Sequence, residues 1–412
     1  MITLKKFVQV GIGNRGLNAY ARPLVARYKD YAKLCGVYDV NPKRAALVSK
    51  ITETDVPVYD DFDKMLDEVK PDSVIVTCRD CDHDYYIIKS LNKGYNVISE
   101  KPLTTTFEKV YAIKEAKDKT DKDLIVTFNL RFQPFFAQIK ELIKSGEVGD
   151  ILSIHYEWML NTSHGADYFR RWHRERKNSG SLLIHKSTHH FDLANWFLEE
   201  DPVAVNAFGT RRFYGAQREE KSERCLTCPY KDTCELYFDI EASDNDKRLY
   251  YECEDADGYF RDKCVFSDEI DIEDSLSVSV EYSGGAIMSY SLTAHSPYEG
   301  LNISINGTKA RMEIKKTLKK IDGYSENAEE SITVFTRDGK AKKIPVVEST
   351  SEGHGGADEK LRDMLFKEKT DDPLCQMADL RAGVMSIAIG MASNISLKEK
   401  RRVLINEFLK DI

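Results

Sequence analysis

The segment from Leu182 to Trp196, with the sequence LLIHKSTHHFDLANW, gathers ionisable side chains within an otherwise apolar stretch. These side chains belong to His185, Lys186, His189, His190 and Asp192. The unperturbed pKa of histidine, about 6.5, lies near neutral pH, so a histidine here can accept a proton from a hydroxyl group. A lysine ammonium beside the same oxygen favours the negative charge that develops there. The segment therefore predicts proton transfer on an alcohol.

Helical spacing sorts these residues into two faces. His185, His189 and Asp192 are separated by four and three positions, which places them on one face of a helix, while Lys186 and His190 point elsewhere. We expect Asp192 to orient His189. Two alternatives stay open: Asp192 and His190 are hydrogen-bonded core groups, or the two histidines of the shared face bind zinc with Asp192 as a third ligand.

A glycine-rich motif near the N-terminus predicts a dinucleotide site. The motif GIGNRG, Gly11 to Gly16, follows an apolar strand at 7–10 and precedes a helix at 17–28 and a strand at 33–38. In such a strand, helix, strand unit the glycines allow a tight turn, backbone approach to a diphosphate and close helix packing. Asp39 ends the second strand, where a carboxylate accepts hydrogen bonds from the ribose and repels a 2′-phosphate. NAD is therefore expected, with NADP as the alternative.

Lys101 is the next residue that could take part in chemistry. It belongs to the tripeptide Glu100-Lys101-Pro102, directly after an apolar strand at 95–99. Ligands of open α/β sheets collect outside the carboxyl ends of the strands, and a following proline restricts Lys101 to extended geometry. A solvated lysine in a turn is the alternative.

The elements that must position these residues form two patterns. Helices and strands alternate up to a last strand at 123–128, which predicts an α/β doubly wound parallel sheet of the Rossmann type. The strands of this part are expected at 7–10, 33–38, 56–59, 73–77, 95–99 and 123–128. Later segments mostly alternate apolar with polar residues, which predicts an α+β domain with an open, mainly antiparallel sheet. These segments are 151–158, 276–282, 286–292, 301–305 and 310–314.

We therefore expect an NAD-binding domain at 1–128 and a second, α+β domain at 129–412. The second domain carries a cysteine-rich insert at about 215–268. A helix at about 378–394, rich in Ala, Gly and Met, is expected to pack back against another element, such as the N-terminal domain.

Five segments together resemble the glucose-fructose oxidoreductase, inositol dehydrogenase and rhizopine-catabolism family, written Gfo/Idh/MocA. They are GIGNRG at 11–16, Asp39, TCRDCDH at 77–83, EKP at 100–102 and GSLLIHKSTH at 180–189. The resemblance covers most of the chain in the same order, apart from the insert. It implies NAD(P)-dependent chemistry on sugars or cyclitols. It also implies that the domain at 129–412 serves substrate binding and oligomerisation, in a homodimer or homotetramer.

The resemblance also implies roles for single residues. Lys101 lies next to the nicotinamide and the reacting hydroxyl, and His189 is the acid/base. His185 stands where the family commonly has an acid, which leaves open whether His185, Lys186 or His189 carries the proton. The residues expected at the cofactor are Gly11, Gly13, Asn14, Arg15, Gly16, Asp39, Thr77, His83, Glu100 and Lys101. Those expected at the substrate are Asn129, Arg131, Trp172 and Lys186, with His354 either in the pocket or in a turn.

The cysteine-rich insert departs from the family plan. Cys225, Cys228, Cys234 and Cys264 are spaced as four thiolates that can bind a structural zinc, with Cys253 as a spare or substitute ligand. Free thiols are the alternative, because a cytosolic setting disfavours disulfides.

Composition excludes several classes of function. The 412 residues are 42% hydrophobic and 31% charged, which is ordinary for a globular protein. The formal net charge of -8 disfavours nucleic acid as a partner. No apolar run is expected to cross a bilayer. The apolar N-terminus is interpreted as a strand rather than a signal peptide. We therefore expect a cytoplasmic enzyme without a membrane partner. Two other functions stay open: a redox-neutral, NAD-dependent glycoside cleavage, and a non-catalytic sensor of NAD and sugar.

Overall fold

The structure is a computed structural model that describes residues 4–318, 330–347, 354–367 and 371–410. The chain folds into two compact units, each built from three stretches of sequence. Unit 1 comprises residues 1–129, 222–263 and 351–384, and unit 2 comprises 130–221, 264–350 and 385–412. The cysteine-rich insert is therefore divided, and most of it belongs to the unit that contains the glycine motif.

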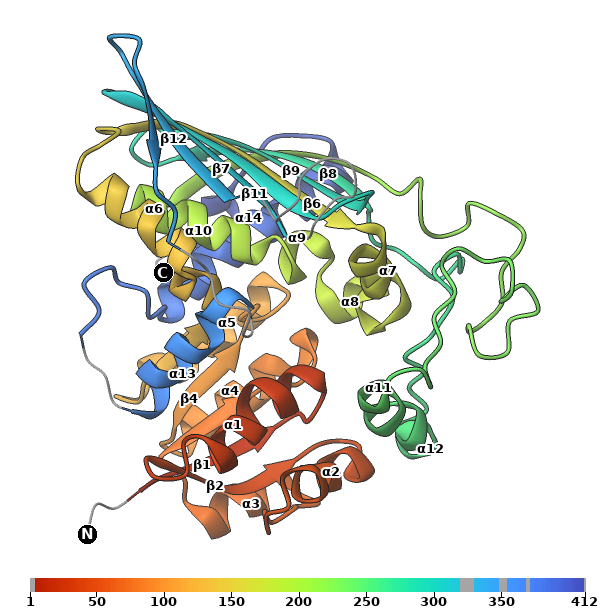
Figure 1. Cartoon of the computed structure of the whole chain (residues 1–412). Coiled ribbons are helices and arrows are strands. Elements are labelled where there is room, and N and C mark those ends of the chain that lie inside the picture. Colours follow the sequence, from red (N-terminus) through yellow and green to blue (C-terminus); the bar gives the residue numbers. More distant parts are fainter. Residues whose placement is uncertain (1–3, 319–329, 348–353, 368–370, 411–412) are drawn as a thin grey trace. The chain divides into compact units, whose positions relative to one another are not determined.

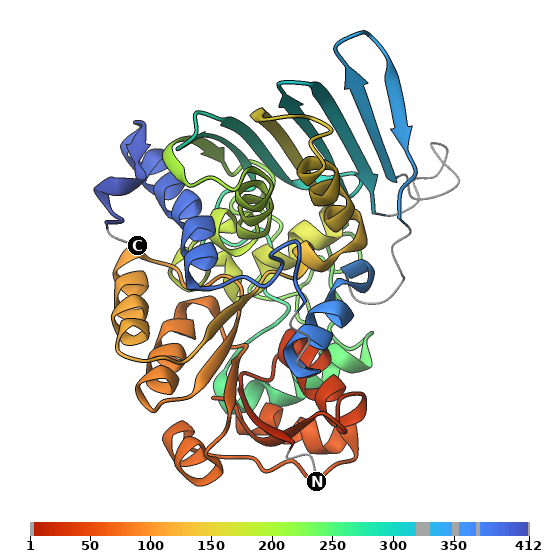
Figure 2. The ribbon, with the colours of Figure 1, turned by 90° about the vertical axis from the view of Figure 1, so that its left-hand side faces the viewer.

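Unit 1 contains a parallel five-stranded sheet in the order β2-β1-β3-β4-β5. The strands are β1 Lys5–Val10, β2 Ala32–Tyr38, β3 Ser73–Val76, β4 Asn96–Glu100 and β5 Leu124–Thr127. The helices between them are α1 Arg22–Ala26, α2 Pro42–Thr52, α3 Phe62–Val69, α4 His83–Asn92 and α5 Phe107–Asp118. Helices lie on both faces of this sheet (Figures 1 and 2). This is the doubly wound arrangement predicted from the alternation of strands and helices.

Burial explains why these strands pair in parallel. All four residues of β3 and the last four of β1 are buried, so both faces of the sheet must be covered. One local prediction was wrong: residues 56–59 form no strand but a single bridge between Val37 and Val58. The helix expected at 17–28 is present, as a π-helical segment Gly16–Ala21 that continues directly into α1.

Later parts of the chain complete unit 1. The insert contributes α11 Asp244–Leu249 and α12 Glu254–Asp257, joined by a 3-10 turn at Tyr251–Cys253. The segment after residue 353 contributes a 3-10 turn at His354–Gly356 and α13 Ala357–Phe366. The division between the units falls within α14, Leu380–Glu399.

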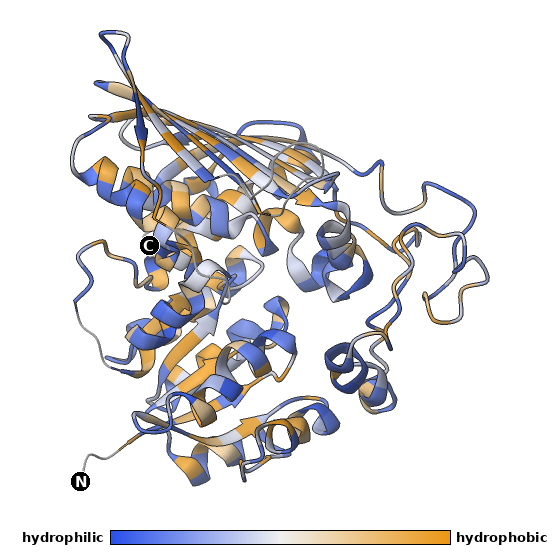
Figure 3. Ribbon diagram, viewed as in Figure 1, coloured by the Kyte–Doolittle hydropathy of each residue, from blue (hydrophilic) through white to orange (hydrophobic). Residues whose placement is uncertain are grey.

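Unit 2 contains a nine-stranded sheet in the order β13-β12-β11-β10-β6-β9-β8-β7-β14. Its pairs are antiparallel except for β6 with β9, which confirms the predicted α+β class. The strands are β6 Ile151–Asn161, β7 Pro202–Thr210, β8 Ser275–Tyr282, β9 Ile287–Ser296, β10 Gly300–Gly307, β11 Ala310–Thr317, β12 Glu330–Thr336, β13 Ala341–Ile344 and β14 Val403–Leu404. Along these strands apolar and polar residues alternate (Figure 3), so that one face is buried.

The helices of unit 2 are short apart from α6, α10 and the second half of α14. They are α6 Pro134–Lys144, α7 Thr162–Arg170, α8 Arg176–Ser179, α9 Leu182–His185 and α10 Thr188–Leu198. By length and composition α14 is the one helix in the described residues that could cross a membrane, although no such run was expected from the sequence. However, 61% of its most apolar window is buried inside the protein, as in a core helix.

Candidate functional site

The glycine motif forms a tight loop between β1 and the helix that follows. Gly11 has a φ of +87°, and a Cβ atom there would lie 2.5 Å from the Cys78 backbone nitrogen. A Cβ atom at Gly16 would lie 2.2 Å from the Gly11 carbonyl oxygen. At Gly13 the space is open, since a Cβ atom would meet only the Tyr250 hydroxyl at 3.9 Å. The loop therefore has the turn, the close helix packing and the accessible middle that a dinucleotide requires.

Asp39 follows β2 beside this loop. Its Oδ2 accepts a hydrogen bond from the Ile12 N–H at 2.6 Å and its Oδ1 accepts one from the Asn41 N–H at 2.8 Å. Burial raises the pKa of Asp39, while Arg44 and the two N–H groups act in the opposite direction. The carboxylate is thus fixed at the strand end where a ribose would bind.

Thr77 and His83 support the loops at the strand ends. The Thr77 hydroxyl donates to the Gly11 carbonyl oxygen at 2.6 Å. The His83 ring lies between two carbonyl oxygens, with Nδ1 2.7 Å from that of Pro102 and Nε2 3.3 Å from that of Cys78. Both side chains are buried. Burial is the main reason why the pKa of His83 is lowered, so the ring is neutral near pH 7.

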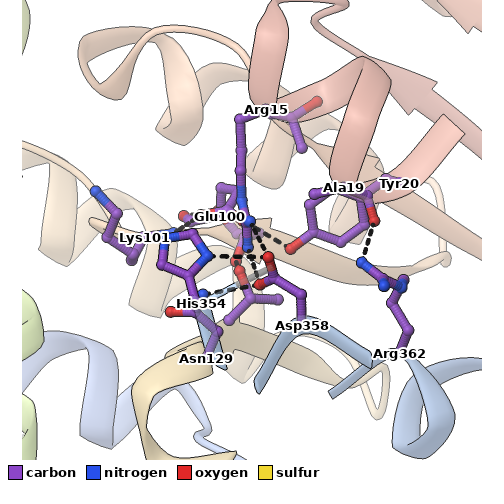
Figure 4. A network of polar contacts seen from close by, with 12 residues as sticks. Arg15, Ala19, Tyr20, Glu100, Lys101, Asn129, His354, Asp358 and Arg362 are labelled. Carbon is purple, nitrogen blue, oxygen red and sulfur yellow. Dashed lines mark hydrogen bonds and ion pairs between the residues drawn. The ribbon is translucent and has the colours of Figure 1, made fainter. Parts of the chain in front are cut away.

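Glu100 links the Lys101 loop to the glycine motif (Figure 4). Its Oε1 accepts hydrogen bonds from Arg15 Nε and from the Tyr20 hydroxyl, both at 2.7 Å. Its Oε2 accepts one from the Lys101 backbone N–H at 3.2 Å. Burial alone would raise the pKa of Glu100, but Arg15 and Lys101 lower it. The buried carboxylate therefore stays ionised and holds the backbone that carries Lys101.

Asp358, from α13, continues this network. It accepts two hydrogen bonds from Arg15, at 2.8 and 2.9 Å, and one from Asn129 Nδ2 at 2.8 Å. His354 Nδ1 lies 2.9 Å from its Oδ2. Although burial acts to raise it, Arg15 and His354 bring the pKa of Asp358 far below its usual range. Asn129, predicted at the substrate, is thus buried against α13, and His354 reaches the same carboxylate.

In unit 2 the histidine segment does not form one continuous helix. α9 ends at His185 and α10 begins at Thr188, with Lys186 and Ser187 between them. The prediction that His185, His189 and Asp192 share one helical face was therefore wrong. The two histidines lie on different helices.

Asp192 has a partner other than His189. Its Oδ2 accepts from Arg131 Nε at 2.8 Å and its Oδ1 accepts from Arg131 Nη2 at 2.6 Å, and both residues are buried. His190 stacks on Trp158 with ring centroids 4.2 Å apart, and its Nδ1 lies 2.8 Å from the Tyr290 hydroxyl. Asp192 and His190 are therefore core groups, which was one of the two expected alternatives.

His185 belongs to an aromatic cluster. Its ring centroid lies 4.1 Å from that of His173, 5.4 Å from that of Tyr168 and 5.8 Å from that of Trp172. Trp172 in turn stacks on His173 at 3.6 Å. Lys186 Nζ lies 5.0 Å from the Trp158 ring centroid. The structure thus places three predicted residues, His185, Trp172 and Lys186, against aromatic or imidazole rings.

Three polar residues of this neighbourhood were missed by sequence reasoning. Glu299 Oε1 lies 2.8 Å from His164 Nδ1, and His164 Nε2 lies 3.1 Å from the Tyr168 hydroxyl. Burial would raise the pKa of Glu299, but His164 and Lys186 lower it. Glu299 and His164 are 135 residues apart, so no local motif marks the pair.

The predicted zinc site is not supported. Among the described residues, no three or more His, Cys, Asp or Glu side chains are grouped so that they could hold a metal ion. The insert is instead held by an ion-pair cluster: Arg224 pairs with Glu254 at 2.6 Å and with the buried Asp262 at 2.7 Å. The backbone N–H of Cys225 donates to the Asp262 carbonyl oxygen at 2.8 Å.

Known proteins match both parts of the chain. A family model described as "Oxidoreductase family, NAD-binding Rossmann fold" matches residues 5–128, and one described as "Oxidoreductase family, C-terminal alpha/beta domain" matches residues 140–405. The chain is similar to YteT of Bacillus subtilis (strain 168), with 37% identity over 99% of both proteins. It is 28% identical to inositol 2-dehydrogenase 2 of Saccharopolyspora erythraea, over 47% of this chain and 55% of that protein.

Solved structures share the fold at low identity. The WlbA dehydrogenase of Bordetella pertussis, in complex with NADH and UDP-GlcNAcA, matches with a TM-score of 0.66 and 18% identity, over 98% of this chain and 99% of that one. The myo-inositol 2-dehydrogenase of Lactobacillus plantarum matches with a TM-score of 0.64 and 15% identity, over the same shares of the two chains. The two family models and the 37% identity with YteT show that the chain belongs to the Gfo/Idh/MocA family of NAD(P)-dependent oxidoreductases.

Proposed function

We propose that the protein transfers a hydride between a secondary hydroxyl of a sugar, glycoside or cyclitol and the nicotinamide of NAD. In this reaction the carbinol carbon loses a hydride to the nicotinamide ring and the hydroxyl oxygen loses a proton. Lys101 polarises that oxygen, and His189 takes the proton, with His185 as a second candidate for proton transfer. In the reverse direction the same groups supply the proton to a ketone.

The observation that carries the proposal is the bonding of the Lys101 loop. Lys101 follows β4 at the carboxyl edge of a parallel sheet, where cofactors of this fold bind. Its backbone N–H is held by Glu100, which is itself held by Arg15 of the glycine motif. A lysine so placed can present its ammonium to a developing alkoxide.

The glycine motif and Asp39 support NAD as the cofactor. The open space at Gly13 leaves backbone N–H groups for a diphosphate, and the Asp39 carboxylate can accept from the ribose hydroxyls. Bound there, NAD supplies the hydride acceptor. NADP is the alternative cofactor. It is disfavoured because the charge of Asp39 would repel the 2′-phosphate.

A polyhydroxylated substrate is supported by unit 2. Trp172 and the rings around His185 offer aromatic faces, and Lys186 with Glu299 offers charged groups that bond hydroxyls. The relatives named inositol dehydrogenases point to the same class of substrate. We further propose a homodimer or homotetramer, as the family resemblance implies, and a cytoplasmic location.

The test is a screen for NADH formation, by its absorbance, with NAD and a panel of cyclitols, sugars and glycosides. The proposal expects net NADH with at least one substrate. Cleavage of a glycoside without net NADH would support the redox-neutral alternative. Binding of NAD and a sugar without turnover would support a sensor and contradict the proposal.

A further inference from the structure

The cysteine-rich insert contacts the glycine motif within unit 1. The Tyr250 hydroxyl accepts a hydrogen bond from the backbone N–H of Asn14 at 3.1 Å. Asn245 Nδ2 donates to Asn14 Oδ1 at 3.0 Å. Tyr250 is only 4% exposed, so its ring is fixed by packing. An insert side chain thus occupies one of the loop N–H groups that a diphosphate would approach.

Carboxylates of the same insert form ion pairs with the two basic residues that follow β2, Lys43 and Arg44. Lys43 Nζ pairs with Asp255 at 2.6 Å, and Arg44 pairs with Asp257. Asn41, the N-cap of α2, donates through Nδ2 to the Cys253 carbonyl oxygen at 2.9 Å. In nucleotide-binding sheets a basic residue at this place accommodates the 2′-phosphate of NADP. Here carboxylates of the insert engage both basic residues.

Arg44 lies between the insert and the ribose side of the site. It acts to lower the pKa of Asp39, and its guanidinium lies 5.8 Å from the Tyr250 ring centroid. Arg224 bonds Glu254 of α12 and the buried Asp262. The end of the insert that carries α12 is therefore held by Arg224 and by the two cations of α2.

We propose that three residues of the insert belong to the dinucleotide site: Tyr250 contacts the diphosphate, and the carboxylates of Asp255 and Asp257 select NAD over NADP. A phenol accepts and donates at once, so the oxygen that accepts from Asn14 can donate its proton to a phosphate oxygen. A 2′-phosphate would face carboxylates, with both cations already paired. The inference rests on cofactor binding by this family and is independent of the roles of Lys101 and His189.

Fluorescence titrations with NADH and NADPH test both parts. Tyr250→Phe removes one hydrogen bond to a charged group, so NADH binding should weaken about tenfold. Tyr251→Phe, the same change at the next residue, is the matched control and should bind NADH like the wild type. The double variant Asp255→Asn/Asp257→Asn should bind NADPH about tenfold more tightly and NADH within about threefold of the wild type.

The outcomes separate the claims. Equal or tighter NADH binding by Tyr250→Phe would overturn the diphosphate contact. Tighter binding would show that the Tyr250 hydroxyl must give up its bond to the Asn14 N–H before NADH binds. Unchanged NADPH affinity of the double variant would overturn the selection by charge. Should that variant fail to fold, the single variant Asp257→Asn and amide hydrogen exchange of the wild type replace it. NADH is then expected to slow the exchange of amides in 244–257, and unaltered exchange would contradict the proposal. A wild type that binds neither nucleotide would instead refute the cofactor assignment.

Discussion

The Asp358 carboxylate accepts two hydrogen bonds from the Arg15 guanidinium, although the two residues are 343 positions apart in the sequence. Arg15 also bonds Glu100, whose second oxygen holds the Lys101 N–H. One arginine therefore joins the nucleotide loop, the lysine loop and α13 in a single network. Lys101 depends for its backbone position on a helix from the far end of the chain.

Asp358→Asn should destabilise unit 1 by about 2 to 3 kcal/mol, because it removes a carboxylate that is bonded by a partly buried guanidinium. Chemical unfolding measures this change. Glu359→Gln, one residue along α13 and more exposed, is the matched control and should change the free energy of unfolding by less than about 1 kcal/mol. Equal effects of the two substitutions would contradict the network.

His83 should make stability depend on pH. Because burial lowers its pKa in the folded state, the unfolded chain binds the proton first as the pH falls. The free energy of unfolding therefore decreases from about pH 6.5 downwards, by up to about 1.4 kcal/mol per pH unit for one histidine. His83→Asn should remove this component, whereas His155→Asn, at an exposed position, should retain it. A stability difference between wild type and His83→Asn that is constant with pH would refute the assignment.

Arg131 is predicted from the family resemblance to bind substrate, yet it is buried against Asp192. Arg131→Met leaves a buried carboxylate without its guanidinium partner and should cost about 3 to 5 kcal/mol, which thermal or chemical unfolding detects. Arg131→Met/Asp192→Leu should recover most of that loss. Lys119→Met, which breaks an exposed pair with Glu115, serves as the surface control. A loss below 1 kcal/mol for Arg131→Met would show that the pair is not structural.

The sequence alone predicted the elements whose signal is local. The glycine motif and the strand at 73–77, with its continuous apolar run, led directly to the parallel sheet, and alternation led to the strands of unit 2. The histidine segment was misread because its helical spacing continues through Lys186 and Ser187, where the backbone breaks. Spacing shows which residues can share a face, but tertiary bonds decide whether the helix is continuous.

Contacts between distant residues could not be predicted. Nothing near Arg15 in the sequence indicates Asp358, and nothing near Asn14 indicates Tyr250. The cysteines of the insert matched the spacing of zinc ligands, but an Arg224–Asp262 pair holds that region. A spacing rule can tell which side chains are available, whereas only the fold tells which of them meet.

Single-turnover mixing of NAD-loaded protein with a substrate from the screen tests the central claim, that Lys101 and His189 serve hydride transfer. Lys101→Met and His189→Gln should each bind NADH within about threefold of the wild type. Their rate of NADH formation should fall by about 100-fold or more. For His189→Gln the dependence of that rate on pH should also be lost. Wild-type rates in both variants, with the same pH dependence, would contradict the account.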